Sequence, residues 1–209
     1  MLDPVAAYDR IAPSFARLSE QRRAYLDAVE RLIVSAIPAG SHSLLDIGAG
    51  DGVRSLGIAQ AAGLKEIVLL DPSASMREHR PAGVTAWAMR AEDLHAQQGQ
   101  FDVITCLWNV LGHIFPARAR SEVLRQCARL LGRGGRIFVD VNHRYNASIT
   151  EWRPRPGKII TLTRLSDLCR VGQLLFELRG EVGEGGLARI DIQRLAGKHH
   201  GDIRNAQEA

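Results

Sequence analysis

The stretch that decides the fold is LLDIGAGDG, residues 44–52. It begins with an apolar run, which predicts a buried strand, and it ends in three glycines, each separated from the next by one residue. Glycine permits a sharp turn and a close approach of the backbone to a ligand. A helical pattern over residues 53–62 follows directly, so the N–H groups of a helix N-terminus would face whatever binds there. The stretch therefore predicts a binding loop at the end of a strand.

On both sides of this stretch, short apolar runs alternate with helical patterns. The expected strands are 43–47, 65–71, 84–89, 101–108 and 136–142. Helices are expected over 19–37, 53–62 and 117–131, with a short one from Ser73. Strands joined by helical crossovers form an open, mostly parallel α/β sheet with helices on both faces. Ligands of such sheets bind beyond the carboxyl ends of the strands, so we expect the site there.

The chain changes character after residue 143. Residues 144–158 are basic and have no helical period, and strand-like runs follow at 159–165, 173–182 and 187–195. These runs predict an antiparallel β extension, with a hairpin turn at the glycine-rich residues 183–186. The extension either completes the sheet or covers the substrate. In the second case the sheet keeps an open edge, which a homodimer would cover.

The expected domain organisation follows from these patterns. It comprises an N-terminal helical cap segment (1–40), a cofactor-binding core (41–143), an antiparallel β extension or substrate cover (144–196) and a flexible tail (197–209).

Two classes of ligand use a glycine-rich turn followed by an acidic residue at the end of the second strand. Here that residue is Asp71, which would accept hydrogen bonds from ribose hydroxyls. A dinucleotide loop needs its third glycine at position 53, where this chain has Val53. Asp46 is unfavourable beside a pyrophosphate and favourable beside an ammonium or sulfonium group. Both features disfavour NAD and an oxidoreductase.

The chain resembles the class I S-adenosylmethionine-dependent methyltransferases of the small-molecule type. The likeness rests on five motifs in family order and on an N-terminal segment that in the family often closes over the cofactor. The motifs are residues 45–52, 68–73, 91–94, 101–113 and 123–136, and the N-terminal segment is 8–12. The resemblance implies a Rossmann-like, doubly wound sheet, S-adenosylmethionine as cofactor, and methyl transfer.

The resemblance also implies which residues hold the cofactor. They are Asp46, Gly48, Gly50, Asp71, Ala91, Glu92 and Leu107. The glycines would pack under the cofactor, Asp46 would lie near its amino group and Asp71 would hold the ribose. Ala91 and Glu92 would lie along the adenine, and the chain at Leu107 would lie beside the methionine part of the cofactor.

One residue departs from the family pattern. Arg90 stands where many relatives carry an aspartate that contacts the adenine amino group. Arginine cannot accept that hydrogen bond, so the contact must come from Glu92 or the backbone, or be absent.

Methyl transfer requires from the protein mainly alignment of the reactants and exclusion of water. A general base is needed only when the acceptor must lose a proton. His113 and His143 are the neutral-pH bases expected near the mouth of the site, with His113 favoured. Arg144 would hold a carboxylate of the acceptor through a bidentate pair. These three residues are the catalytic candidates, and no metal site is expected.

Composition excludes other classes of protein. The chain has 209 residues, a net charge of +4 and only 5% aromatic residues, which disfavours a base-stacking nucleic-acid platform. No apolar run approaches the ~20 residues of a membrane span. The spacing of the three cysteines matches neither a zinc site nor a disulfide framework, and favours a cytoplasmic location.

We therefore expect an enzyme that methylates a nitrogen or oxygen of a small molecule, with no nucleic-acid or membrane partner. The alternatives are a non-catalytic S-adenosylmethionine-binding module, a methyltransferase acting on RNA or protein, and the disfavoured NAD-linked oxidoreductase.

Overall fold

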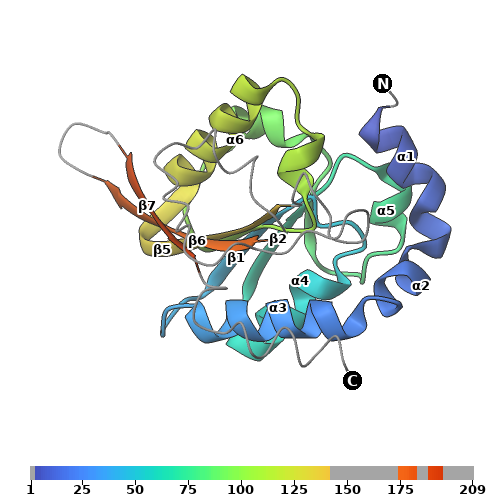
Figure 1. Ribbon diagram of the computed structural model, residues 1–209, viewed down its shortest axis with the longest axis horizontal. Coiled ribbons are helices and arrows are strands. Elements are labelled where there is room, and N and C mark those ends of the chain that lie inside the picture. The colour runs from blue at the N-terminus through green and yellow to red at the C-terminus, as the bar shows by residue number, and fades with distance from the viewer. Residues whose placement is uncertain (1–2, 142–173, 183–187, 195–209) are drawn as a thin grey trace, which may run out of the picture.

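Strand β1 (Ser43–Ile47) is the strand predicted from LLDIGAGDG, and it lies inside the sheet with every residue buried. In the computed structural model, which describes residues 3–141, 174–182 and 188–194, it pairs in parallel with β2 (Glu66–Leu70) and β4 (Phe101–Cys106). β3 (Thr85–Trp87) lies beyond β2, and β5 (Leu131–Val141) beyond β4, both also parallel. The predicted parallel α/β sheet is confirmed (Figure 1).

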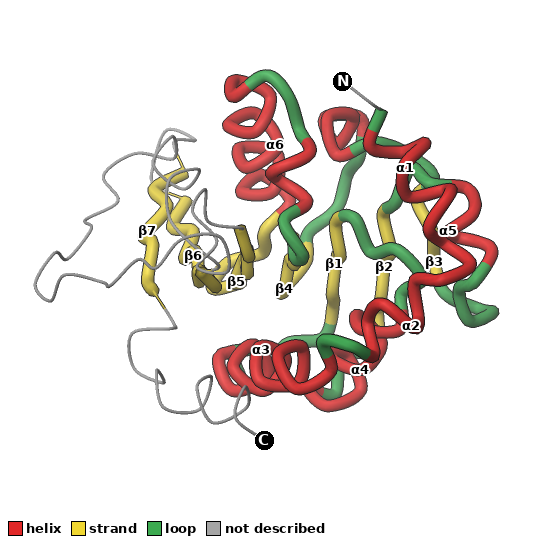
Figure 2. Tube along the Cα trace, turned by 45° about the vertical axis from the view of Figure 1, so that its right-hand side comes forward, coloured by secondary structure: helices red, strands yellow, loops and turns green. Residues whose placement is uncertain are grey.

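Helices cover both faces of this sheet. α3 (Arg23–Ala36) and α4 (Val53–Ala62) lie against one face, and α6 (Ala117–Leu130) lies against the other (Figure 2). Successive strand residues point to opposite faces. Leu44 accordingly belongs to the core under α3 and α4, whereas Leu45 belongs to the core under α6. Burial on both faces explains why the strand is a continuous apolar run.

Several predicted boundaries are wrong. The strands expected over 84–89 and 101–108 are shorter, at Thr85–Trp87 and Phe101–Cys106. The single helix expected over residues 19–37 is instead α2 (Phe15–Glu20) and α3, separated at residues 21–22. The glycine-rich stretch at 132–135 was expected to separate α6 from the next strand, but β5 begins at Leu131, directly after the helix. Leu131 already pairs with Phe101, and the register then shifts before Val103 pairs with Arg136. This irregularity takes up the extra residues inside the strand.

The sheet continues past β5 with two antiparallel strands. β6 (Leu174–Val182) pairs with β5, and β7 (Ala188–Arg194) pairs with β6, which gives the strand order β3-β2-β1-β4-β5-β6-β7. The edge of β5 that would be open in a truncated sheet is therefore paired, so that reason for expecting a homodimer does not apply at this strand. The expected run 159–165 and the tail 197–209 lie outside the described residues.

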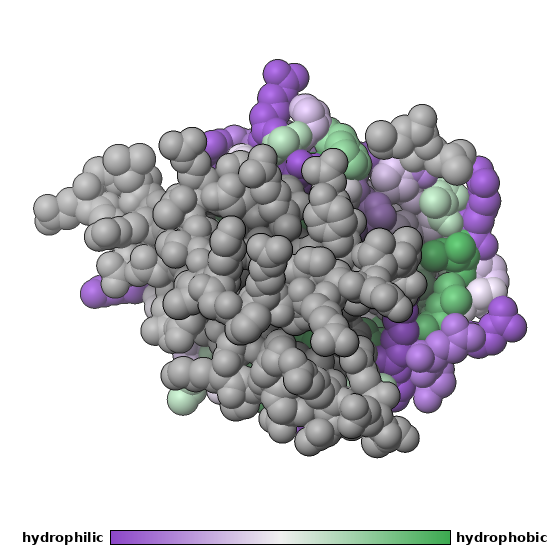
Figure 3. Space-filling model, viewed as in Figure 1, coloured by the Kyte–Doolittle hydropathy of each residue, from purple (hydrophilic) through white to green (hydrophobic). Residues whose placement is uncertain are grey.

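The N-terminal segment forms α1 (Pro4–Ile11), the 3-10 turn η1 (Ala12–Ser14) and α2, and it packs beside α5 (Ala74–Glu78). Figure 3 shows an apolar area at the surface over α1 and α2, bordered by hydrophilic residues. Ile11 and Leu18 are exposed large apolar side chains of these two helices. Among the described residues, no helix is long and apolar enough to span a bilayer.

Candidate functional site

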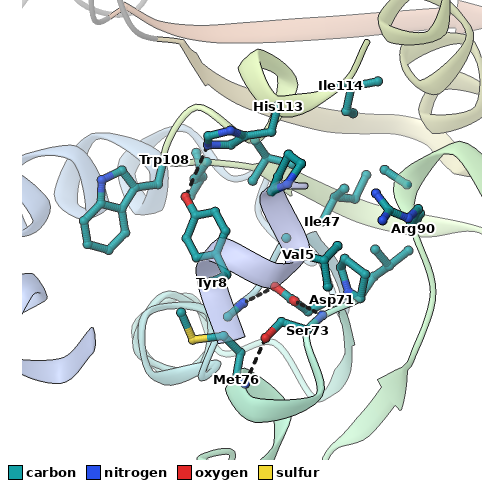
Figure 4. A pocket seen from close by; sticks show the side chains of 18 of the residues that line it. Val5, Tyr8, Ile47, Asp71, Ser73, Met76, Arg90, Trp108, His113 and Ile114 are labelled. Carbon is teal, nitrogen blue, oxygen red and sulfur yellow. Dashed lines mark hydrogen bonds between the residues drawn. The ribbon is translucent and has the colours of Figure 1, made fainter. Parts of the chain in front are cut away.

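A cavity lies at the carboxyl ends of β1, β2 and β4, underneath α1 (Figure 4). It contains about 770 Å³ of empty space, including the part open to solvent. The predicted site residues that line it are Gly48, Gly50, Asp71, Ala91, Glu92, Leu107 and His113.

The glycine loop forms the floor of the cavity. Gly48, Gly50 and Gly52 all have positive φ, at 73°, 57° and 76°. A Cβ on Gly48 would overlap the side chain of Val110, and a Cβ on Gly50 would lie 3.6 Å from the ring of Phe15. Glycine is therefore required at position 48 by both conformation and space.

The N–H groups of this loop are already used within the protein. Gly48 and Ala49 donate to the carbonyl of Leu70, at 2.8 and 3.0 Å. Gly50 donates to Asp71 Oδ2 at 2.8 Å. A pyrophosphate site needs such N–H groups to point at the ligand. The loop instead fits a ligand part without phosphate, in agreement with the argument from Asp46 and Val53.

Asp71 directly follows β2 and lines the cavity while remaining only 8% exposed. Its Oδ1 accepts a hydrogen bond from Ser73 N–H at 2.8 Å, and its Oδ2 accepts the bond from Gly50. A carboxylate has about four lone-pair sites, so roughly two remain for a ligand. Two neighbouring hydroxyls, as on a ribose, match that remaining capacity.

Asp46 lies under the loop and is not among the described residues that line the cavity. Its carboxylate accepts hydrogen bonds from Ser55 and, at 2.6 Å, from Thr105. Burial raises the pKa of Asp46, and the two hydroxyl donors act against that rise. Asp46 and Thr105 are paired across β1 and β4. The role of Asp46 toward a ligand amino group stays a prediction.

Side-chain contacts hold the N-terminal helices over the cavity, and the sequence motifs do not predict all of these contacts. Asp9 accepts hydrogen bonds from Ser73 Oγ at 2.5 Å and from Ser75 N–H at 3.2 Å, which ties α1 to α5. The ring of Phe15 packs against that of Trp108, with 5.1 Å between ring centroids. The segment 8–12 that resembles a cofactor-covering element thus lies beside the cavity (Figure 4).

Tyr8 and His113 face each other across the cavity. Tyr8 Oη lies 3.3 Å from His113 Nε2, and the two rings meet edge to face. Burial lowers the pKa of His113. Burial and the negative charge of Asp71 raise the pKa of Tyr8. The phenol therefore keeps its proton and can donate it in a hydrogen bond to a neutral imidazole, which is the form of histidine that acts as a base.

Arg90 lines the cavity with a guanidinium where relatives are expected to have a carboxylate. Its Nη2 lies 3.1 Å from Asp3 Oδ1, and both side chains are about half exposed (47% and 51%). An exposed pair of this kind contributes little to stability. Glu92 also lines the cavity and remains the acidic side chain expected at the adenine end.

Two arginines of the α5 region support the loop from outside, and no sequence pattern points to them. Arg80 donates to the carbonyls of Gly50 at 2.9 Å and Leu69 at 3.0 Å. Arg77 donates to the carbonyl of Asp71 at 2.8 Å. These bonds hold the glycine loop and the end of β2 together at the point where Asp71 turns into the cavity.

Comparison with known proteins agrees with this geometry. Residues 45–137 match the family model described as a methyltransferase domain. They contain the glycine loop, Asp71, Glu92 and His113, in the order that the resemblance requires. Residues 45–137 are a methyltransferase domain, and their motifs resemble those of the class I S-adenosylmethionine-dependent type.

The chain is 35% identical over 118 residues to a ubiquinone biosynthesis O-methyltransferase of Ralstonia nicotianae. The match covers 54% of this chain and 48% of the relative, so the chain spans about half the length of that protein.

Solved structures share the fold of the methyltransferase domain at low identity. One is CalS10 with bound S-adenosylmethionine, an amino pentose methyltransferase from Micromonospora echinaspora, with a TM-score of 0.52 and 17% identity. It covers 86% of this chain and 80% of the other. Another is the sugar N-methyltransferase KedS8 from Streptoalloteichus, with a TM-score of 0.52, 16% identity, and coverage of 91% and 83%.

Two of the catalytic candidates, His143 and Arg144, lie outside the described residues. Of the three, His113 is therefore the one that the structure places at the cavity of the methyltransferase domain.

Proposed function

We propose that the protein transfers a methyl group from S-adenosylmethionine to a small-molecule acceptor. The observation that carries this proposal is the pairing of Asp71, which faces the cavity, with a glycine loop whose N–H groups are bonded to β2. This floor suits a nucleoside without a pyrophosphate. The resemblance to an O-methyltransferase and to a sugar N-methyltransferase keeps both oxygen and nitrogen nucleophiles in the proposal.

In this proposal each wall of the cavity holds one part of the cofactor. Gly48 and Gly50 let its methionine part lie against the backbone, while Asp71 holds the ribose hydroxyls. Ala91 and Glu92 border the adenine, and Leu107 borders the methionine part. When bound, S-adenosylmethionine supplies a methyl group that is already activated by the positive charge on its sulfur.

The chain's own contribution is alignment and exclusion of water. Tyr8, Phe15 and Trp108 bring three aromatic rings to the cavity of a chain with few aromatic residues. Aromatic faces attract cations, which suits a positively charged ligand. α1 closes this side of the cavity through the bonds between Asp9 and α5.

The cofactor is tested by calorimetry with S-adenosylmethionine, S-adenosylhomocysteine and NADH. We expect the first two to bind to one site and NADH not to bind, because the N–H groups of Gly48, Ala49 and Gly50 are already bonded within the protein and do not point at a pyrophosphate. Binding of NADH alone would overturn the proposal. Binding of the first two without turnover of any amine, acid or phenol would leave a non-catalytic S-adenosylmethionine-binding module.

We propose His113 as the general base for acceptors that must lose a proton. His113→Gln is expected to lower the rate at saturating substrate by about 100-fold, a typical contribution of a general base. Burial lowers the pKa of His113, so its neutral form persists below the ordinary value of about 6.5. The wild-type rate should therefore fall only when the pH drops below that value.

The matched control for this test is His95→Gln. His95 is exposed, bonds only to the carbonyl of Glu92 among the described residues, and does not line the cavity. It should leave the rate unchanged. An unchanged rate in His113→Gln would remove His113 from the mechanism and leave His143 as the candidate base.

We propose Arg144 as the group that holds a carboxylate of the acceptor. Arg144→Ala is expected to raise the apparent KM of a carboxylate-bearing acceptor about tenfold or more, since a charged hydrogen bond contributes about 1.5–3 kcal/mol. The affinity for S-adenosylhomocysteine should stay the same. An unchanged KM, measured with the acceptor found in the panel of amines, acids and phenols, would contradict this role.

A further inference from the structure

Two consecutive residues beside the cavity have a backbone conformation that favours glycine, although neither is glycine. Trp108 has a φ of 58° and Asn109 a φ of 62°, and they lie one residue beyond the end of β4, after Leu107. Left-handed backbone is uncommon for other residues and is an outlier for a bulky one such as tryptophan. It persists only where the surrounding structure fixes the chain. A specific contact must therefore hold this turn.

That contact comes from Asp140, on the neighbouring strand β5. Asp140 is 2% exposed, and its Oδ1 accepts a hydrogen bond from Asn109 N–H at 2.8 Å. Cys106, the last residue of β4, pairs with Val139, so residue 140 lies just where the chain leaves β4 and turns. Burial raises the pKa of Asp140, whereas the N–H groups of Asn109 and Trp108 and the charge of Arg54 act to lower it.

The turn at Trp108 and Asn109 fixes the position of one wall of the cavity. The short helix η3 (Val110–His113) begins immediately after Asn109, whose carbonyl accepts a bond from Gly112 N–H at 2.8 Å. The side chain of Val110 fills the space beside Gly48, and His113 reaches Tyr8. Asp140 itself is not among the described residues that line the cavity. It acts on the cavity only through the turn.

We propose that Asp140 is a positioning residue, which holds the left-handed turn at Trp108 and Asn109 and thereby sets the place of His113 in the cavity. The inference rests on the proposed function, in which His113 is the base. The position of His113 can nevertheless be measured without turnover and without any ligand.

The competing explanation is that Asp140 only stabilises the protein as a whole. Asp102 offers a matched control. It is also a strand carboxylate that accepts backbone bonds, from His42 N–H at 2.7 Å and Ser43 N–H at 3.0 Å. Asp102 lies near the amino ends of β1 and β4, whereas the cavity lies at the carboxyl ends of the strands. Asp102→Ala should therefore destabilise the protein without reaching His113.

The experiment follows the imidazole of His113 by NMR titration, with the resonance assigned by its loss in His113→Gln. In Asp140→Ala, the pKa of His113 should move up toward the ordinary value of about 6.5, because the side chain leaves its place in the cavity beside Tyr8. In Asp102→Ala it should stay at the wild-type value. Each variant is also unfolded in urea, so that the loss of stability is known.

A second variant tests the turn itself. Asn109→Gly adopts a positive φ without strain, so Asp140→Ala combined with Asn109→Gly should restore the wild-type pKa of His113 and part of the stability. Asn109→Gly alone measures what the Asn109 side chain contributes. If Asp140→Ala fails to fold but the double variant folds, the proposal is supported.

Three results would overturn the proposal. The first is an unchanged pKa of His113 in Asp140→Ala. The second is an equal shift in Asp140→Ala and Asp102→Ala. The third is a double variant that folds and titrates no better than Asp140→Ala. In each case S-adenosylhomocysteine binding by the wild-type protein would still report separately on the proposed function.

Discussion

Asp71→Ala should lose nearly all affinity for S-adenosylhomocysteine, by a factor of about 100–10,000. Hydrogen bonds to a charged group contribute about 1.5–3 kcal/mol each, and the cavity face of Asp71 has room for two. The same change removes the acceptor of Gly50 N–H, so the loop also loses a bond that fixes it. Calorimetric titration of the purified variant measures the loss.

Asp51→Ala is the control for this experiment. Asp51 lies on the same loop and carries the same charge, but its side chain bonds to Val53 N–H at 3.2 Å and does not line the cavity. Its affinity for S-adenosylhomocysteine should stay within a few-fold of the wild type. Equal affinities in the Asp71 and Asp51 variants would show that the ligand does not use Asp71, and would contradict the proposed orientation of the nucleoside.

Among single alanine substitutions in the glycine loop, Gly48→Ala should destabilise the protein most. The new Cβ would overlap Val110, and the residue would still need a φ of 73°. Left-handed backbone costs a non-glycine residue about 1–2 kcal/mol, and overpacking costs about 1–3 kcal/mol more. We expect a loss of about 2–5 kcal/mol in the free energy of unfolding in urea, together with weaker binding of S-adenosylhomocysteine.

Gly63→Ala separates the two contributions. Gly63 ends α4 with a φ of 74°, nearly the same as that of Gly48, but a Cβ there meets nothing within 4 Å. It should lose only the conformational part, about 1–2 kcal/mol, and bind the ligand normally. If the two variants are equally stable, the side chain of Val110 moves aside at little cost, and its packing against Gly48 does not fix the glycine loop.

The centre of the fold was predictable because local signals and burial agree there. Residues 43–47 and 53–62 are apolar where the sheet and its helices need them to be, and the glycines between them mark the turn, so both predicted ranges match β1 and α4. The break between α2 and α3 has no such signal. Residues 21–22 are glutamine and arginine, both compatible with a helix, and neither glycine nor proline marks the separation.

The site residues that could be predicted lie close together in the sequence, within one structural unit that brings them together in space. Gly48, Gly50 and Asp71 belong to one strand–turn–helix–strand unit, so their meeting follows from the parallel sheet. The contacts of Asp46 with Thr105, of Asp9 with Ser73 and of Asp140 with Asn109 join distant segments. Each depends on a register or a helix position that a single sequence does not specify.

The hydrogen bonds between the glycine loop and β2 have a consequence for the energetics of binding. A loop that becomes ordered only around its ligand adds the entropy of that ordering to the cost of association. Here the N–H groups of Gly48, Ala49 and Gly50 are bonded to Leu70 and Asp71 of the protein itself, so the contacts that fix the loop belong to the fold. When ligands that bind against this loop differ in affinity, the difference should come from the contacts that each ligand makes with the loop. Rearrangement of the loop should contribute very little.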